Sequence, residues 1–421
     1  MIAINKNILA LKPSATLEIN QKVKELKNKG KTIFHLGFGQ SPLSVHKSIV
    51  KKLRKYATVN TYLPTLGLPE LIHQIGVFLK EHQGITDTNR AVYIGPGSKE
   101  LLYQTILLLE GVFLIPKGSW VSYGPQIQAK GSRFKILSTD FENDFKLKAT
   151  DLDAFCKMDT SKQKTLILNS PNNPTGAVYT AQELKEIAAI CKKYRVIVLS
   201  DEIYSQLNFN ANYSPSICTY YSEKTIVFGG LSKVFSAGGY RLGFMSLPKE
   251  FNYLETSFKA LFSETFSCVS SPIQYAAIKA FKFDIKLQLY VEQQSEILKN
   301  IAAFVKTELE LAQIRCTKTQ GGFYMMIGFE KHKKQLKKLG FLTSKQLADY
   351  LLDTYRVALL PASDFYFNKD EFWFRLAFVD FNGKKMLKNN SQLNFDKSFV
   401  KKNCPNVFYG VEKLKEFAFT L

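Results

Sequence analysis

Several side chains that can bind ligands or transfer protons stand at or directly after apolar runs in this chain. They are an amide, a carboxylate with a phenol, a primary amine and a serine–lysine pair: Asn173, Asp201 with Tyr204, Lys233, and Ser98 with Lys99. A lysine amine can act as a nucleophile or move protons, and a carboxylate can hold a nearby nitrogen in its protonated form. A carboxylate and a lysine alone could equally form a structural ion pair. The additional amide, phenol and helix start favour a reactive site instead.

The apolar runs that precede these residues predict strands of one sheet. The runs are separated by helical patterns and cover residues 91–94, 165–169, 196–200 and 225–229. Alternating strands and helices are typical of crossover connections in a mostly parallel sheet, which binds ligands at the carboxyl ends of its strands. We therefore expect the reactive side chains to meet at one edge of this sheet.

The two ends of the chain predict a second, smaller unit. A helix is expected from Ser14 to about Asn28, and the second half of the chain is rich in helices, with strand signals at 322–327 and 372–378. The predicted fold is α/β, with a large domain whose mostly parallel sheet is flanked by helices, and a smaller α+β domain built from both chain ends. The expected boundaries are 46–285 for the large domain, and 1–45 with 286–421 for the small one.

Composition excludes several classes of protein. Hydrophobic residues make up 45% and charged residues 22%, which are ordinary values for a globular chain. No apolar run is long enough to span a membrane, and the N-terminus lacks the pattern of a signal peptide. The six cysteines are scattered, which argues against a disulfide framework and a zinc site. We expect a cytoplasmic protein without a metal or a membrane partner.

The formal net charge of +21 has two interpretations. It could mark a nucleic-acid partner, or it could reflect lysines spread over a solvated surface. The densest run, residues 331–338, fits a helix face with Leu336 and Leu339 turned inward, and it lacks the aromatic platform that stacks on bases. We expect no nucleic-acid partner, although the charge can attract anionic substrates.

Three motifs, in this order and spacing, resemble the class I/II aminotransferases, which are fold-type I enzymes that use pyridoxal 5′-phosphate. The motifs are Ser-Pro-Asn-Asn-Pro-Thr-Gly at 170–176, Asp-x-x-Tyr at 201–204, and Ser-Lys at 232–233 followed by Gly-Tyr-Arg-Leu-Gly at 239–243. The similarity extends from Lys12 to Leu376. It implies an aminotransferase that exchanges an amino group between an amino acid and a 2-oxo acid by a ping-pong mechanism.

The resemblance implies a role for each residue that would hold the cofactor ring. Lys233 would bind the cofactor covalently and move the proton at the substrate Cα, and Asp201 would face the pyridine nitrogen. Asn173 and Tyr204 would bind the ring hydroxyl oxygen, and Trp120 would stack on the ring. Core packing for Trp120 or Tyr204, and a turn at Asn173, are the alternatives.

The resemblance also implies donors for the cofactor phosphate. Ser98 and Lys99 begin a helix, whose free N–H groups favour an anion, and Arg241 follows Lys233 at the family spacing. Tyr62 matches a tyrosine that reaches the phosphate of the neighbouring subunit, which implies a homodimer with shared active sites. One departure is Gly230, which stands where many relatives have Ser or Thr.

Arg375 lies among apolar residues, where an unpaired guanidinium is costly. The resemblance makes it the clamp for the substrate α-carboxylate, with Gly39 and Asn173 beside that carboxylate; a structural salt bridge is the alternative. No second arginine is evident for a distal carboxylate. The expected neutral, aromatic or aliphatic side chain of the substrate rests on three nearby aromatic residues: Phe38, Phe323 and Tyr324.

Two other functions remain open. The same scaffold carries carbon–sulfur β-lyases and related eliminating enzymes, which also need Lys233 and Asp201. It also occurs in regulators that bind DNA, but this chain has no helix-turn-helix module before the family pattern begins.

Overall fold

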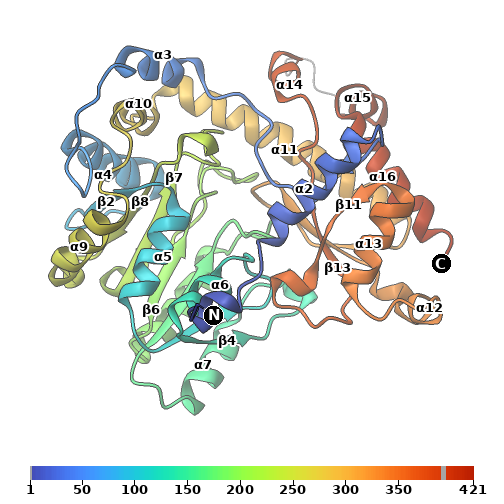
Figure 1. Ribbon diagram of the computed structural model, residues 1–421, viewed down its shortest axis with the longest axis horizontal. Helices are drawn as coiled ribbons and strands as arrows, with labels where there is room; N and C mark the ends of the chain where they lie inside the picture. The colour runs from blue at the N-terminus through green and yellow to red at the C-terminus, as the bar shows by residue number, and fades with distance from the viewer. Residues whose placement is uncertain (1, 390–394) are drawn as a thin grey trace.

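A seven-stranded sheet forms the centre of the larger of two lobes in the computed structural model, which describes residues 2–389 and 395–421 (Figure 1). The strand order is β2-β8-β7-β6-β5-β3-β4. The strands are β2 (Ala91–Gly95), β3 (Val112–Pro116), β4 (Arg133–Leu137), β5 (Lys164–Asn169), β6 (Ile197–Asp201), β7 (Thr225–Gly230) and β8 (Gly243–Leu247).

The direction of the strands confirms the expected mostly parallel sheet. Neighbours from β4 to β7 pair in parallel, whereas β8 pairs antiparallel with both β2 and β7. The runs predicted from the sequence correspond to β2, β5, β6 and β7. The strands β3, β4 and β8 were not predicted.

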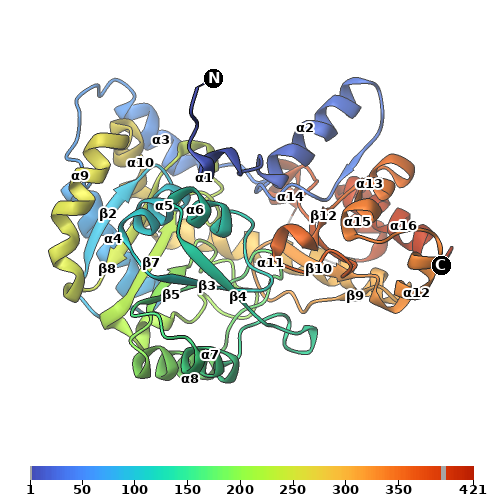
Figure 2. The same cartoon turned by 60° about the horizontal axis from the view of Figure 1, so that its bottom comes forward.

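Helices cover both faces of this sheet (Figure 2). Ile167 packs in the cluster that contains α5, α6 and α9, while its neighbours Leu166 and Leu168 pack in the cluster that contains α7 and α8. Because both faces are buried, the central strands are apolar at nearly every position. The helices of this lobe are α3 (Lys47–Tyr56), α4 (Pro69–Gln83), α5 (Ser98–Leu108), α6 (Tyr123–Lys130), α7 (Ala149–Met158), α8 (Ala181–Lys193), α9 (Glu255–Thr265) and α10 (Ser271–Phe281).

The second lobe joins segments from both ends of the chain. The strand β1 (Phe34–His35) pairs in parallel with β11 (Val357–Ala358), and α2 (Ala15–Asn28) begins after Ser14. A four-stranded sheet contains β9 (Arg315–Cys316), β10 (Tyr324–Gly328), β12 (Leu360–Pro361) and β13 (Trp373–Ala377). The other helices of this lobe are α11 (Ile285–Leu311), α12 (Lys333–Lys338), α13 (Ser344–Tyr355), α14 (Gly383–Asn389), α15 (Lys397–Asn403) and α16 (Pro405–Ala418), whereas α1 (Lys6–Leu9) packs against α6 of the larger lobe. The long helix α11 runs between the two lobes (Figure 1).

The lysine-rich run forms α12 as a solvated helix, but one detail of the prediction is wrong. Leu336 is buried, whereas Leu339 is 61% exposed. Leu339 follows the last residue of α12, and the chain then turns at Gly340, whose φ is +89°. Leu339 therefore leaves the helix face that packs inward. No helix in the described ranges is long and apolar enough to cross a membrane.

Candidate active site

The carboxyl ends of β5, β6 and β7 open into a cavity of about 450 Å³ between the two lobes. Asn169 and Asp201 are register partners at this edge of the sheet. Two residues proposed from the sequence, Tyr62 and Phe323, do not line this cavity, although Phe323 lies beside Lys233. The others line it: Phe38, Gly39, Ser98, Lys99, Trp120, Asn173, Asp201, Tyr204, Lys233, Arg241, Tyr324 and Arg375. The parallel sheet and the segments that pack on its edge thus bring together side chains that are far apart in the sequence.

Asp201 ends β6 at the floor of the cavity. Its Oδ2 accepts a 2.7 Å hydrogen bond from the Tyr123 hydroxyl. Burial raises the pKa of Asp201 to about 6, while the Tyr123 hydroxyl, the Ile203 N–H and the charge of Lys233 lower it. The carboxylate is therefore suited to bind a cationic or protonated nitrogen that enters the cavity.

Lys233 follows β7 and lines the same cavity as Asp201, whose pKa its charge lowers. Its Nζ donates a 3.2 Å hydrogen bond to the carbonyl oxygen of Gly39 and lies 5.6 and 5.2 Å from the ring centroids of Tyr204 and Phe323. Within the described ranges no carboxylate forms an ion pair with Lys233, so its amine is available for chemistry.

Arg375 lies on β13 and is only 1% exposed. Its guanidinium donates to Asn173 Oδ1 at 3.1 Å and to the Gly37 carbonyl oxygen at 2.6 Å, while its buried Nε has no hydrogen-bond partner. The ring of Tyr324 lies 4.5 Å from the guanidinium carbon. No carboxylate among residues 2–389 and 395–421 lies within ion-pair distance of Arg375, which argues against the structural salt bridge; the buried carboxyl of Asp364 interacts with the guanidinium only from farther away. A buried cation without a contacting anion is expected where a ligand supplies the negative charge.

The opposite end of the cavity collects hydrogen-bond donors. Helix α5 begins at Ser98, so the free N–H groups of its first turn point into the cavity region. Arg241 lies beside them: its guanidinium donates to the carbonyl oxygens of Gly238 and Pro96, each at 3.0 Å. A Cβ atom on Gly97, whose φ is +105°, would lie 2.5 Å from the guanidinium of Arg241. This end of the cavity suits an anion such as a phosphate.

The structure gives a physical reason for Gly230. A Cβ atom there would lie 2.8 Å from the carbonyl oxygen of Leu242 and 2.9 Å from Cα of Gly243. No side chain fits at this position without moving β8, so backbone groups, Ser98, Ser232 and Arg241 are left to bind an anion. Ser232 lines the same cavity.

Trp120 lies at the wall of the cavity, half-buried beside Tyr123. The two rings are T-shaped, with centroids 5.4 Å apart. The ammonium of Lys99 lies 5.3 Å from the indole centroid, and in the part of the chain that the structure describes it forms no ion pair. Burial raises the pKa of Tyr204 well above its usual value, and its hydroxyl lies 3.4 Å from that of Tyr324.

Two residues of the site were not predicted. Asn169 donates from Nδ2 to the backbone oxygen of Asp201 at 2.7 Å and accepts the Asn173 N–H at 2.8 Å, so it fixes two strand ends together. It is the last residue of a predicted strand, which is the signal that could have found it. Tyr123 lies three residues after Trp120, but nothing in the local sequence shows that its hydroxyl reaches Asp201.

Tyr62 lies outside the cavity and is 90% exposed. Its loop is held against α10 by a hydrogen bond from the Ser271 hydroxyl to the Thr61 carbonyl oxygen at 2.6 Å. Tyr62 therefore does not pack within its own chain, so that alternative is wrong, and its contact with another subunit stays a prediction.

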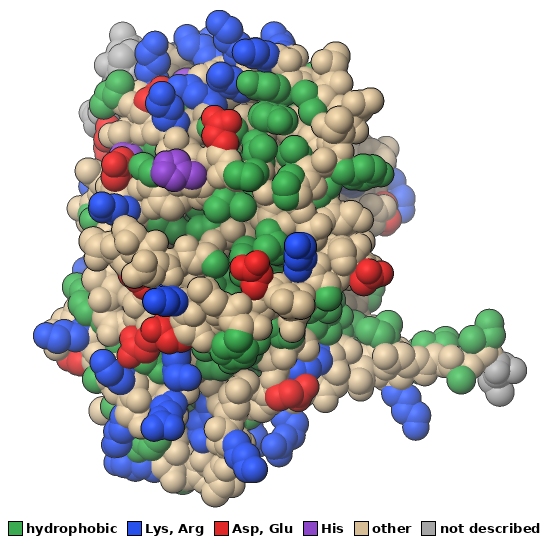
Figure 3. Space-filling model, turned by 90° about the vertical axis from the view of Figure 1, so that its left-hand side faces the viewer, with side chains coloured by type: hydrophobic (Ala, Val, Ile, Leu, Met, Phe, Trp, Pro, Cys, Tyr) green, Lys and Arg blue, Asp and Glu red, His purple; other side chains and the backbone are tan. Residues whose placement is uncertain are grey.

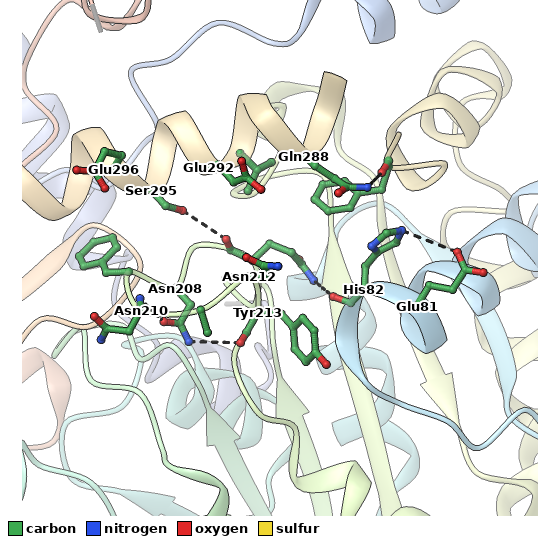
Figure 4. Close-up of a pocket in the computed structure, with 15 residues that line it drawn as sticks. Glu81, His82, Asn208, Asn210, Asn212, Tyr213, Gln288, Glu292, Ser295 and Glu296 are labelled. Carbon is green, nitrogen blue, oxygen red and sulfur yellow. Dashed lines mark hydrogen bonds and ion pairs between the residues drawn. The ribbon is translucent and has the colours of Figure 1, made fainter. Parts of the chain in front are cut away.

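A second cavity, of about 330 Å³, lies between the end of α4, the loop 206–213 and α11 (Figure 4). Its charged lining residues are Glu81, Glu292 and Glu296, and no Lys or Arg lines it. It contains none of the residues proposed from the sequence. Because its charge is negative, this cavity does not suit an anionic cofactor or substrate carboxylate.

Comparison with known proteins agrees with the geometry. The family model described as aminotransferase class I and II matches residues 31–386. The aspartate aminotransferase of Geobacillus stearothermophilus is 32% identical over 371 residues, which cover 86% of this chain and 91% of that protein. The aromatic-amino-acid aminotransferase 2 of Thermococcus litoralis is 30% identical, over 79% of this chain and 84% of that one.

A solved structure shares the fold. The aspartate aminotransferase from Thermus thermophilus with maleate superimposes with a TM-score of 0.83 at 22% identity, and covers 100% of both chains. The matched family model, the named relatives and the shared fold lead to one conclusion: this chain belongs to the class I and II aminotransferases.

Proposed function

We propose that this protein is a pyridoxal 5′-phosphate-dependent aminotransferase that exchanges an amino group between an amino acid and a 2-oxo acid by a ping-pong mechanism. The single observation that carries this proposal is the state of Arg375: its buried guanidinium lines the same cavity as Lys233, and no carboxylate of the described residues lies within ion-pair distance of it. Amino acids and 2-oxo acids both carry a carboxylate that could make this contact.

The residues of the cavity fit the proposed cofactor. Asp201 would bind the ring nitrogen, Ser98 and Arg241 with the start of α5 would bind the phosphate, and Lys233 would bind the aldehyde carbon covalently. Trp120 would cover the ring, and Asn173 with Tyr204 would bind the ring hydroxyl. Asp201 and the anion-binding donors line one cavity. The cofactor requires both, because it carries a protonated ring nitrogen and a phosphate. When bound, the cofactor supplies an electron sink for the electron pair that remains on Cα after the Cα–H bond loses its proton.

Each side chain of the site then has its own role in the proposed reaction. Arg375 holds the substrate carboxylate and so orients the Cα–H bond toward Lys233. The Lys233 amine would be the base that takes the proton from the substrate Cα and the acid that gives it back. Asp201 would hold the ring nitrogen of the bound cofactor in its protonated form, and the hydrogen bond from Tyr123 supports the charged form of Asp201.

We propose a neutral substrate side chain, aromatic or aliphatic. Phe38, Leu17, Tyr324 and Trp120 line the cavity and offer apolar surface for such a side chain. An acidic substrate is the second candidate. It is favoured by Lys99, whose ammonium lines the cavity and has no ion pair in the described ranges, and by the name aspartate aminotransferase among the relatives.

Elimination of a β-substituent is not favoured, because the named relatives are aminotransferases. Exposed apolar residues support a homodimer with shared active sites: Tyr62 and Ile2 are each 90% exposed, Tyr253 is 75% exposed and Ile4 is 58% exposed. A narrow arm of the chain also projects from the molecule (Figure 3). The six cysteines, all unpaired, support a reducing cytoplasm. We also propose the domain division 46–285, and 1–45 with 286–421.

Two measurements test the function. Borohydride reduction of the protein with bound cofactor, followed by peptide mapping, should place the adduct on Lys233; an adduct on another lysine contradicts the proposal. A panel of amino donors against pyruvate and 2-oxoglutarate should show transfer from neutral or aromatic donors. A strong preference for aspartate, lost in Lys99→Met but not in Lys52→Met, would select the acidic substrate instead.

A further inference from the structure

Tyr366 holds an uncommon backbone conformation at the boundary between the two lobes. It follows the short helical turn Ala362–Phe365, and its φ is +70° with ψ +19°, the left-handed region that favours glycine. An aromatic residue in this region is strained, and such strain persists where surrounding contacts fix the residue. The contacts of the phenol ring show what holds it there.

The Tyr366 hydroxyl makes two hydrogen bonds to one turn of the larger lobe. It donates to the carbonyl oxygen of Trp120 at 3.1 Å and accepts the N–H of Gly124 at 2.8 Å. Gly124 lies in the first turn of α6, whose N-cap residue, Ser122, makes no side-chain capping bond. Tyr366 therefore supplies from a distant segment the acceptor that a helix start normally obtains from its own N-cap.

The space around Gly124 shows how closely the two segments fit. A Cβ atom on Gly124 would lie 3.0 Å from Cε1 of Tyr366 and 3.2 Å from its hydroxyl oxygen. A second bond, from the Gly118 N–H to the Phe365 carbonyl oxygen at 2.9 Å, ties the same two segments together. The ring of Phe365 also lies 5.2 Å from the guanidinium carbon of Arg375.

We propose that Tyr366 is a positioning residue for the cofactor site. The turn that it holds carries Trp120 at its start and Tyr123, the hydrogen-bond donor to Asp201, one residue before Gly124. One hydroxyl group thus sets the place of both the ring-stacking indole and the Asp201 partner, and it links them to the segment that packs on Arg375. This inference rests on the proposed function, because it assigns the turn a role in holding the cofactor.

The test uses the full chain and the fluorescence of Trp120. The chain has two tryptophans, so a Trp373→Phe background leaves Trp120 as the only one. Tyr366→Phe in this background keeps the ring and removes both hydrogen bonds. We expect acrylamide quenching of Trp120 in the cofactor-free protein to rise about twofold or more, and the affinity for pyridoxal phosphate to fall about three- to tenfold.

Tyr179→Phe is the matched control, because the Tyr179 hydroxyl is also buried and accepts a backbone N–H, that of Leu147, at 2.8 Å, away from the cavity. Tyr179→Phe should leave both the acrylamide quenching of Trp120 and the affinity for pyridoxal phosphate unchanged. Gly124→Ala disturbs the same contact from the other side and replaces Tyr366→Phe if circular dichroism shows that variant to be unfolded. Quenching of Trp120 that is equal in the parent, the Tyr366 or Gly124 variant and the control overturns the proposal.

The experiment distinguishes a failure of the proposed function from a failure of the positioning role of Tyr366. If the parent protein binds no pyridoxal phosphate while Trp120 still loosens in Tyr366→Phe, the proposed function is wrong and the positioning of the turn stands. If the cofactor binds to the parent and to Tyr366→Phe with equal affinity, the role of Tyr366 in the site is refuted and the proposed function is not.

Discussion

The hydroxyl of Tyr123 lies 2.7 Å from Oδ2 of Asp201 and donates a hydrogen bond to it in the buried floor of the cavity. This bond opposes the effect of burial, which raises the pKa of Asp201 to about 6. The protonation of Asp201 is thus set by desolvation on one side, and by the Tyr123 hydroxyl, the Ile203 N–H and the charge of Lys233 on the other.

Removal of that phenol should make cofactor binding more sensitive to acid. In Tyr123→Phe the pKa of Asp201 rises further, so less of the carboxylate is ionised at pH 6. A rise of about one unit would weaken the affinity for pyridoxal phosphate about fivefold at pH 6 and very little at pH 8. Titration of cofactor absorbance at the two pH values measures this. An equal loss at both would show that Tyr123 acts by packing alone.

Asp201→Asn should have opposite effects on stability and on activity. In the cofactor-free wild type the folded-state pKa of Asp201, about 6, exceeds its ordinary value of 3.8. Folding therefore takes up a proton between these values, and stability falls as the pH rises through this window. The variant avoids that loss, so it should gain up to about 3 kcal/mol over the wild type above pH 6, and nothing below pH 4.

The same variant should lose transamination, because no carboxylate then holds the ring nitrogen protonated. A rise of ~3–5 kcal/mol in the barrier corresponds to a loss of about two to four orders of magnitude in turnover. Thermal melts at pH 4 and pH 7 and single-turnover rates supply the two measurements. Near-normal turnover would refute the role of Asp201.

Arg375→Gln should remove recognition of the substrate carboxylate. Binding of a 2-oxo acid to the wild-type protein should raise its melting temperature, and this shift should vanish in the variant. The expected fall in kcat/KM is about 10²-fold or more, because a charge-assisted pair is lost. Arg315→Gln, a change on the edge strand β9 outside the cavity, should leave the melting shift intact. A retained shift in Arg375→Gln would contradict the assignment.

Tyr62 can be tested by mixing subunits. Tyr62→Phe and Lys233→Ala chains are each expected to be weak or inactive. If Tyr62 serves the partner's site, a mixed dimer has one site with both defects and one with neither, so mixing should restore up to half of the wild-type activity per mixed dimer. If Tyr62 acts within its own chain, mixing restores nothing. A stable, active monomer would also rule out a shared site.

The ends of the central strands could be predicted because these strands are buried on both faces and pair in parallel. Strands buried on both faces are apolar at nearly every position, so β5, β6 and β7 stand out in the sequence, and their carboxyl ends must meet. The strand β8 was missed because its sequence, Gly243–Leu247, follows a glycine-rich turn and offers only a short apolar run. Its reversed direction depends on pairing with β2 and β7, which no local pattern encodes.

Contacts between segments that are distant in the chain could not be predicted from the sequence. The bonds from Tyr123 to Asp201 and from Tyr366 to Trp120 depend on where whole segments pack, and a tyrosine in the sequence does not show where its hydroxyl points. The burial of Arg375 was expected from its apolar neighbours. That no carboxylate of the described residues lies within ion-pair distance of it could be learned only from the folded structure.

The parallel pairing of β1 with β11 has a consequence for the order of events during synthesis. The ribosome can release every strand of the seven-stranded sheet while the partner of β1 and the strand that carries Arg375 have not yet been made. A nascent chain at that stage contains Lys233 and Asp201 but not Arg375, the proposed carboxylate clamp. The residue proposed to recognise the substrate is therefore the last part of the site to be made, and a chain that ends between residues 247 and 375 contains every strand of the sheet but lacks Arg375.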